Sequence, residues 1–337
     1  MTRTEQAIAD QDTLAALGEF GLIAELSAAL PPAPKTLVGI GDDAAVLAAP
    51  DGRVVATTDF LLEGRHFRRD WSGPSDVGRK AAARSLIDVA AMGAVPTGLL
   101  VALAAPGDLP VSWALGLAEG LAAECARVGA SVVGGDTARA SSVLLAVTGL
   151  GDLRGRAPVL RSGAAPGDVV AVAGPLGRAA AGLALLSAGL LDDPLAAAHR
   201  RPQPPYDAGP EAADLGATAM IDISDGLLAD LGHIADASGV LIDVSAAAVA
   251  PGDVLLAAAR RHDLFDRTDR GSSPGHPDAL AWVLTGGEDH ALAATFPASV
   301  ALPPRWSVIG RVLAGQGVLV DGRPWAGPAG WDHFGAP

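Results

Sequence analysis

The chain has 337 residues, half of them hydrophobic, which suffices for two ordinary domains with cores of Ala, Val, Leu and Ile. Its 38 acidic residues outnumber the 24 basic ones and give a net charge of -14, which excludes the basic surface that a nucleic-acid binder needs. Cys125 is the single cysteine, so no intrachain disulfide forms, and no apolar stretch reaches the ~20 residues of a membrane span. Because Met1 to Asp12 also lacks the pattern of a signal peptide, we expect a cytoplasmic protein that contacts neither nucleic acid nor membrane.

The first half of the chain predicts alternating helices and strands. Gly18–Leu30 has apolar residues at helical spacing and ends at Pro31. Lys80, Arg84 and Asp88 share one face of a second expected helix, because they follow one another at four-residue spacing. The elements expected after residue 70 are helices at Asp76–Met92 and Ser112–Val128 and strands at Gly98–Ala104, Ser131–Val133 and Ser142–Gly149.

A hairpin is expected between the apolar runs Ala44–Ala49 and Val54–Thr58, because the Asp51-Gly52 pair between them is a typical two-residue turn. Pairing in this register would place Asp43 close to Asp59. The hairpin would therefore gather acidic side chains at its open end.

The second half repeats the alternation, and the hairpin makes the sheet arrangement mixed rather than purely parallel. We therefore expect an α/β (α+β) fold with mixed sheets and flanking helices, divided into an N-terminal domain of residues 1–150 and a C-terminal domain of residues 151–337. Residues 133–136 and 285–289 echo each other, each after an expected strand, which is consistent with two related halves. The elements expected after residue 160 are strands at Asp168–Ala173, Ala219–Ile223, Val240–Val244 and Trp282–Leu284, helices from Gly177 to Leu190 and from Gly226 to Ala237, and loops at Arg201–Tyr206 and His262–Asp278.

Acidic residues recur at the ends of the expected strands, often beside glycine. A buried carboxylate needs a partner, and several that converge need cations. Mg2+ prefers carboxylate, hydroxyl and phosphate oxygens, and it would also let this acidic chain bind an anionic substrate. The acids of this pattern are Asp42, Asp43, Asp59, Asp88, Asp136, Asp222, Asp225, Glu288 and Asp289, and Thr57 and Thr58 could add hydroxyl ligands.

Each acid also has a structural alternative. Asp-Gly pairs are common turns, Asp222 could cap the helix that follows it, and Asp88 could pair with Arg84 one turn earlier. The recurrence of the pattern at so many strand ends favours a functional role.

Glycine pairs are the second theme, because successive N–H groups in a glycine turn can bind phosphate. Gly134-Gly135 and Gly286-Gly287 are the candidates. The Walker motif and the Gly-x-Gly-x-x-Gly motif are absent, as are a serine nucleophile elbow and paired metal-binding cysteines. The sequence therefore favours phosphate chemistry outside the P-loop class.

Motifs along nearly the whole chain, in the same order, resemble those of the thiamine-monophosphate kinases. They are Gly18–Ile23, Gly39–Ala45, Thr57–Asp59 followed by His66-Phe67, Asp88–Ala94, Gly134–Thr137, Arg161–Gly163, Pro166–Asp168, Ile221–Leu227, Gly286–Asp289 and Trp331–Phe334. The resemblance implies a two-domain fold like that of aminoimidazole ribonucleotide synthetase and a homodimer formed mainly by the N-terminal domains. It further implies phosphorylation of thiamine monophosphate to thiamine diphosphate, by in-line transfer of the γ-phosphate of ATP assisted by several Mg2+ ions.

The resemblance also implies the roles of individual residues. The metal ligands would be Asp43, Thr57, Thr58, Asp59, Asp88, Asp136, Asp222 and Asp225, of which Asp43, Asp59, Asp88, Asp136 and Asp222 form the catalytic set. The nucleotide contacts would be Gly135, Asp136, Arg161 and Ser224, and the contacts to the thiamine moiety His66, Glu288 and Trp331. The acceptor is itself a phosphate, so catalysis needs positioning and charge neutralisation rather than a strong base. Trp331 could stack on the cationic thiazolium ring or simply anchor the last strand.

Some positions depart from the family pattern, and other enzymes of the same fold are alternatives. Arg65 stands where Asn is frequent, and Ser85–Asp88 reads Ser-Leu-Ile-Asp in place of Asn-Leu-Ser-Asp. Selenophosphate synthetase needs a Cys near its N-terminus and the hydrogenase-maturation dehydratase a C-terminal Cys, whereas this chain ends Gly-Ala-Pro. Aminoimidazole ribonucleotide synthetase fits the motifs at 18–23 and 331–334 less well. A binding protein without turnover and an acidic scaffold are the alternatives outside enzymes, and the scaffold predicts no stabilisation by metal.

Overall fold

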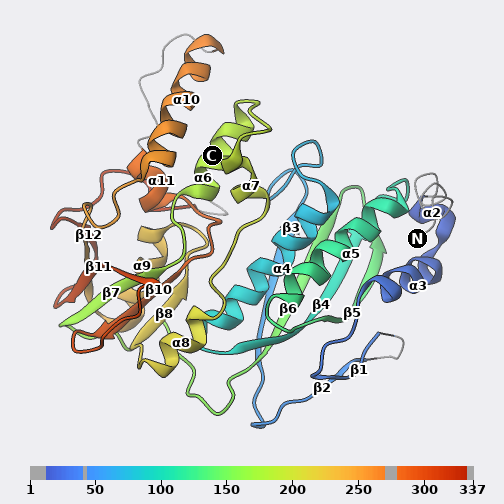
Figure 1. Ribbon diagram of the computed structural model, residues 1–337, viewed down its shortest axis with the longest axis horizontal. Coiled ribbons are helices and arrows are strands. Elements are labelled where there is room, and N and C mark those ends of the chain that lie inside the picture. Colours follow the sequence, from blue (N-terminus) through green and yellow to red (C-terminus); the bar gives the residue numbers. More distant parts are fainter. Residues whose placement is uncertain (1–12, 41–43, 270–278, 332–337) are drawn as a thin grey trace. The chain divides into compact units, whose positions relative to one another are not determined.

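The computed structural model describes residues 13–40, 44–269 and 279–331, and the chain divides into two compact units (Figure 1). One unit comprises Met1–Val89 and Ala94–Gly155, and the other Ala90–Gly93 and Arg156–Pro337. Each has its own sheet and its own helices. In the described part of the chain, no helix has the length and apolar character needed to cross a membrane.

Within the described residues, the main sheet of the N-terminal unit has four strands in the order β3-β6-β4-β5. The pairs β3–β6 and β6–β4 are antiparallel, and β4–β5 is parallel. These strands are β3 (Val55–Leu62), β4 (Val95–Ala105), β5 (Val132–Arg139) and β6 (Leu144–Asp152). The other elements of this unit are the strands β1 (Thr36–Val38) and β2 (Val46–Leu47), which pair with each other, and the helices α2 (Leu14–Leu17), α3 (Glu19–Ala29), α4 (Pro74–Ala91) and α5 (Val111–Ala126).

Helices α4 and α5 lie along one face of this sheet (Figure 1). They approach each other closely through glycines: a Cβ on Gly78 would lie 2.1 Å from the carbonyl oxygen of Leu117, and one on Gly120 would lie 2.2 Å from that of Ser75. Small and apolar residues of α4 are fully buried beneath. This packing fixes α4 against the sheet, so its polar side chains meet those of β3.

The opposite face of the same sheet is partly open to solvent among the described residues, although the Leu47 side chain of β2 lies against Gly98 of β4. Phe60 is 58% exposed and Leu100 is 37% exposed. Phe60 pairs with Ala146, which pairs with Ala102, which pairs with Asp136, so one row of side chains crosses the sheet on this open face. The row is apolar except for Asp136 at the edge strand β5.

The C-terminal unit is built, in its described part, on six strands in the order β12-β9-β11-β7-β10-β8. All neighbours are antiparallel except β12 and β9. Its core combines Val, Ile and Ala of the strands with apolar side chains of α6, α9, α10 and α11. The strands are β7 (Asp168–Ala173), β8 (Ala219–Asp222), β9 (Leu241–Val244), β10 (Leu292–Pro297), β11 (Trp306–Leu313) and β12 (Gly317–Val320), and the helices are α6 (Arg178–Ser187), α7 (Pro194–Arg200), α8 (Ala208–Asp214), α9 (Leu227–Ser238), α10 (Asp253–Asp269) and α11 (Ala279–Thr285).

The predicted hairpin around Asp51-Gly52 is wrong. A turn forms one residue earlier than expected, with Pro50 and Asp51 between the carbonyl oxygen of Ala49 and the N–H of Gly52 that donates to it, and the flanking runs do not pair with each other. β2 pairs with β1, and β3 pairs with β6 along its whole length. β3 is an edge strand, and its pairing with β6 over all of Val55–Leu62 satisfies more backbone groups than the short local hairpin would, so the distant partner prevails over the turn signal. Asp42 and Asp43 lie outside the described residues.

Three further predictions are corrected. The strand expected at Ser131–Val133 continues through the glycine pair to Arg139. Glycine stands at position 135 because a Cβ there would lie 1.9 Å from the carbonyl oxygen of Val101 on the neighbouring strand. Gly134-Gly135 is therefore not a turn. Trp282–Leu284 lies in helix α11, and residues 262–269 end helix α10. The two echoing motifs thus differ in structure, since one is part of a strand and the other follows a helix.

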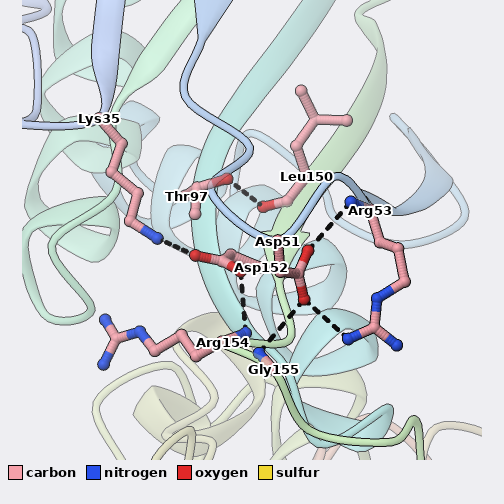
Figure 2. Close-up of polar contacts among 8 residues, drawn as sticks. All are labelled: Lys35, Asp51, Arg53, Thr97, Leu150, Asp152, Arg154 and Gly155. Atoms are coloured by element: carbon pink, nitrogen blue, oxygen red, sulfur yellow. Dashed lines mark hydrogen bonds and ion pairs between the residues drawn. The ribbon is translucent and has the colours of Figure 1, made fainter.

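A polar cluster ties the end of β6 to two loops of the N-terminal unit (Figure 2). Asp152 accepts hydrogen bonds from Lys35 Nζ and from the N–H of Arg154 at 2.8 Å. Asp51 accepts from the N–H of Arg53 at 2.9 Å and from that of Gly155 at 3.2 Å. Burial acts to raise the pKa of Asp152, but the bonds from Lys35 and Arg154 outweigh it and hold that pKa below its usual range. The N–H of Arg53 is the main cause of the lowered pKa of Asp51.

These lowered pKa values make the cluster acid-sensitive. A carboxyl whose folded pKa is depressed stabilises the fold above its unfolded pKa, and this contribution is lost as the pH falls through the folded pKa. We therefore expect the free energy of unfolding to fall between about pH 5 and pH 2, and Asp152→Asn to make this fall shallower. Urea unfolding at a series of pH values measures it, with Asp108→Asn on the surface as the control. A variant as pH-dependent as the unmodified protein would contradict the assignment.

Candidate active site

On the helix-covered face of the N-terminal sheet, β3 and α4 bring together two carboxylates and two hydroxyls. Thr57 Oγ1 donates to Asp88 Oδ2 at 2.7 Å, and Ser85 Oγ donates to Asp59 Oδ2 at 2.7 Å. Arg84 Nη2 lies 3.9 Å from Asp59 Oδ1. Thr57 and Asp59 share a face because side chains alternate along a strand, and Ser85 and Asp88 share a face because they lie about one turn apart on a helix.

The sheet separates the other predicted ligands of this unit from that cluster. Thr58 and Asp136 are exposed and lie on the open face, in the rows that alternate with Thr57 and Asp59. Although Thr58 is adjacent to Thr57 in the chain, the two side chains lie on different faces, because neighbouring residues of a strand point to opposite faces. Asp43 lies outside the described residues.

His66 is held in a fixed orientation by backbone groups. Its Nδ1 accepts the N–H of Leu62 at 3.0 Å, and its carbonyl oxygen accepts a bond of 2.9 Å from Lys80 Nζ. Lys80 is a buried residue of α4, only 1% exposed. Because Nδ1 is an acceptor, the ring proton of neutral His66 lies on Nε2. Nε2 is therefore the donor of this ring, and Arg65 beside it is exposed.

In the C-terminal unit, Asp222 at the end of β8 faces a buried histidine. His290 Nδ1 lies 3.3 Å from Asp222 Oδ2, and both side chains are buried. A carboxylate can only accept, so this pair places the proton on Nδ1. His290 Nε2 is buried, with no hydrogen-bond partner among the residues described. The alternative of Asp222 as a helix cap is not what the structure shows, because its partner is the ring of His290.

The turn Ser224-Asp225-Gly226 follows Asp222 and is gathered around one carboxylate oxygen. Asp230 Oδ2 accepts the N–H groups of Ser224 at 3.0 Å and of Asp225 and Gly226 at 3.1 Å each. Burial raises the pKa of Asp230 to about 7, the charge of Asp222 reinforces it, and the N–H of Gly226 opposes it. Gly226 has φ 135°, a conformation open to glycine. The turn thus carries Ser224 and Asp225 on a fixed backbone.

Two predicted substrate residues are attached to that same turn. The N–H of Glu288 donates to the carbonyl oxygen of Ser224 at 2.8 Å, and the N–H of Trp331 donates to that of Asp225 at 2.9 Å. Trp331 is 54% exposed. The structure therefore brings together Ser224, Asp225, Glu288 and Trp331, whereas it leaves Arg161 exposed on the loop before β7.

Several further groups shape this region, and of these only Asp289 belongs to the acidic pattern of the sequence. Asp289 accepts the N–H groups of Gly177 and Ala179 and caps the start of α6. Burial raises the pKa of Asp289 to about 7, against the effect of these N–H groups. Sequence reasoning missed Asp230 and His290. An acid within the buried stripe of a helix and the residue after a Gly-Gly-Glu-Asp run were the signals that could have pointed to them.

The described residues contain no group of three or more His, Cys, Asp or Glu side chains placed to hold one metal ion. The donor chemistry nevertheless fits a hard cation. The hydroxyl of Thr57 and the carboxylates of Asp59 and Asp88 are oxygen donors on one face of the sheet, and all are half-buried. In the other unit, the charges of Asp222 and Asp225 both raise the pKa of Asp230, so negative charge is concentrated there.

Comparison with known proteins defines the class. The model for "AIR synthase related protein, N-terminal domain" matches residues 41–153, and that for "AIR synthase related protein, C-terminal domain" matches residues 165–321. The chain is thus an AIR synthase related protein with both domains of that class, which confirms the expected α/β fold with mixed sheets.

Individual relatives narrow this class to a family. The thiamine-monophosphate kinase of Mycobacterium tuberculosis is 50% identical over 341 residues, which cover 100% of this chain and 98% of that protein. The crystal structure of the thiamine-monophosphate kinase from Stenotrophomonas maltophilia K279a is 35% identical with a TM-score of 0.74, and the match covers 91% of this chain and 97% of that one. A structure described as "AaThiL complexed with AMPPCP and TMP" is 35% identical with a TM-score of 0.74, covering 94% and 97%. The chain belongs to the thiamine-monophosphate kinase family, and it is an enzyme of the phosphotransferase class, as the motifs predict.

Proposed function

We propose that this protein transfers the γ-phosphate of ATP directly to thiamine monophosphate and so forms thiamine diphosphate, as a step of thiamine diphosphate biosynthesis. The carrying observation is the oxygen-rich cluster in which Thr57 is bonded to Asp88 and Ser85 to Asp59. Similarity over the full length to a thiamine-monophosphate kinase supports the choice of substrate. So does the related structure whose description names AMPPCP and TMP.

Charge neutralisation and positioning would carry this reaction. Asp59, Asp88 and Thr57 in one unit, and Asp222 and Asp225 in the other, would hold Mg2+, as would the predicted ligands Asp43, Thr58 and Asp136. When bound, Mg2+ would neutralise the charge of the transferring phosphoryl group. Ser85 and Arg84 fix the carboxylate of Asp59 for this task.

Substrate binding would use the remaining predicted residues. Gly135, Asp136, Arg161 and Ser224 would contact the nucleotide. The exposed ring of Trp331 and the carboxylate of Glu288 suit the cationic thiazolium ring, and the Nε2–H of His66 would donate to an acceptor atom of the same substrate. The acceptor phosphate is already anionic near neutral pH, so no side chain needs to act as a strong base.

We further propose that the N-terminal domain, residues 1–150, carries the first metal and nucleotide residues and also forms a homodimer, and that the C-terminal domain, residues 151–337, supplies the others. The open face of β3-β6-β4-β5 supports the dimer, because its exposed Phe60, Leu62 and Leu100 form an apolar surface on strands that are otherwise regularly paired. We also propose a cytoplasmic location, as expected from the sequence.

The function is tested by mixing the purified protein with ATP, Mg2+ and thiamine monophosphate and separating the products. Thiamine diphosphate and ADP are expected in equal amounts, with none formed when free thiamine replaces the monophosphate or when EDTA is present. Thiamine diphosphate formed without metal would contradict the mechanism. ATP-dependent stabilisation without any product would contradict the substrate.

A further inference from the structure

The carboxylate of Asp230 has an unusual set of partners for its place in a helix. It is the fourth residue of α9, whereas a helix cap precedes the helix and bonds to the N–H groups of the first turn. The three N–H groups that Asp230 Oδ2 accepts belong to residues 224–226, which come before α9. Its bonds therefore serve the preceding turn and not the helix.

The turn held in this way is the junction of three segments. Besides the bonds to Glu288 and Trp331, the N–H of His290 donates to the carbonyl oxygen of Ile223 at 3.0 Å, and the N–H of Ile223 donates to that of Ala291 at 2.7 Å. The chain around residue 288 and the chain around residue 331 are thus joined to the turn by main-chain hydrogen bonds. Their position depends on the backbone conformation of the turn.

Two glycines show that the main chains at this junction are in close contact. A Cβ on Gly287 would lie 2.4 Å from the carbonyl oxygen of Ser224, and one on Gly330 would lie 2.5 Å from that of Asp225. Both glycines directly precede a predicted substrate residue, Glu288 and Trp331. A shift of the turn would therefore be passed on to both side chains.

We propose that Asp230 is a positioning residue that fixes, through this one turn, the nucleotide contact Ser224 and the acceptor contacts Glu288 and Trp331. The proposal rests on the proposed function, which assigns those contacts. Bonds from N–H groups to a carboxylate are stronger than those to a neutral oxygen, and a buried N–H left without a partner is costly, so the turn keeps this geometry only while Asp230 is present. Loss of the Asp230 side chain should weaken the binding of both substrates together, although this side chain contacts neither substrate.

The test compares Asp230→Ala with Asp168→Ala, using calorimetric titration of a non-hydrolysable ATP analogue with Mg2+ and, separately, of thiamine monophosphate. Asp168 is a matched control because its buried carboxylate also holds a local segment, accepting the N–H of Ala165 at 3.0 Å and the hydroxyl of Thr218 at 2.7 Å. It is the first residue of β7 and is not bonded to the turn at residues 224–226 by any of these contacts. Both variants should melt at lower temperature. Asp230→Ala should bind each ligand about tenfold more weakly, and Asp168→Ala should bind both normally. Asp230→Asn, which keeps one acceptor oxygen, should recover part of the affinity.

Unchanged binding of both ligands to Asp230→Ala overturns the proposal, as does equal weakening in Asp168→Ala. If Asp230→Ala does not fold, hydrogen exchange of the unmodified protein decides. The amides of residues 224–226 should be protected before any ligand is added, and exchange as fast as in an open loop would overturn the proposal. Failure of the unmodified protein to bind thiamine monophosphate would contradict the proposed function instead, and the exchange result and the nucleotide titration would still judge the role of Asp230.

Discussion

Replacement of Asp88 by Asn should lower the turnover of thiamine monophosphate by at least about a hundredfold while the protein remains folded. The Asn side chain has the same shape and can still accept the bond that Thr57 Oγ1 gives to Asp88 Oδ2. The Asn side chain lacks the negative charge that Asp88, as a proposed Mg2+ ligand, supplies to the cluster of β3 and α4. Catalysis that works by charge neutralisation is sensitive to this loss, whereas the packing of the buried α4 around position 88 is not.

The measurement is the steady-state rate as a function of Mg2+ concentration, together with the melting temperature. Asp70→Asn is the control, because Asp70 forms an exposed ion pair with Arg68 at 2.6 Å, and pairs of this kind contribute little. It should leave the rate within about twofold of the unmodified protein. A variant at position 88 that kept a tenth of the activity at all Mg2+ concentrations would remove Asp88 from the metal ligands.

Local patterns predicted much of the fold, because they act within one element. The helix expected at Asp76–Met92 and the strand expected at Asp168–Ala173 follow from periodicity and glycine, and they are present as α4 (Pro74–Ala91) and β7. A turn at Asp51-Gly52 was also predicted from local chemistry, and a turn forms one residue earlier, closed by the bond from the N–H of Gly52 to the carbonyl oxygen of Ala49. Its strands nevertheless pair elsewhere, because pairing over the length of β3 depends on a strand ninety residues away in the chain that no turn signal reveals.

The sequence likewise predicted some residues of the candidate site and missed others. Motifs pointed to Asp59 and Asp88, and the structure brings them to one face through β3 and α4. Periodicity did not separate Thr57 from Thr58, although the pleat places them on opposite faces. Asp230 was missed because its partners are main-chain N–H groups, which every residue except proline has, and its place in the buried stripe of a helix was only a weak signal. Residues that act through the backbone leave only a weak trace in side-chain patterns.

Phe60→Glu should turn a dimer into a monomer. Phe60 is 58% exposed on the edge strand β3 of the open face of β3-β6-β4-β5, and Ala146 and Ala102 follow it in the same row. In a dimer that covers this face, symmetry buries the new charge twice, and a buried charge without a partner costs several kcal/mol. The dissociation constant should therefore rise by on the order of a thousandfold.

Sedimentation at a series of protein concentrations measures this change, and Val308→Glu is the matched control. Val308 is 51% exposed on β11, so it is an equally exposed apolar strand residue, but it belongs to the C-terminal unit. A dimer that survived Phe60→Glu and dissociated with Val308→Glu would move the interface to the C-terminal sheet. If only Phe60→Glu dissociates the dimer, the row of apolar side chains that starts at Phe60 lies in the interface. Its charged end, Asp136 on the edge strand β5, would then lie at the rim of the interface. This position would keep the proposed nucleotide contacts Gly135 and Asp136 accessible.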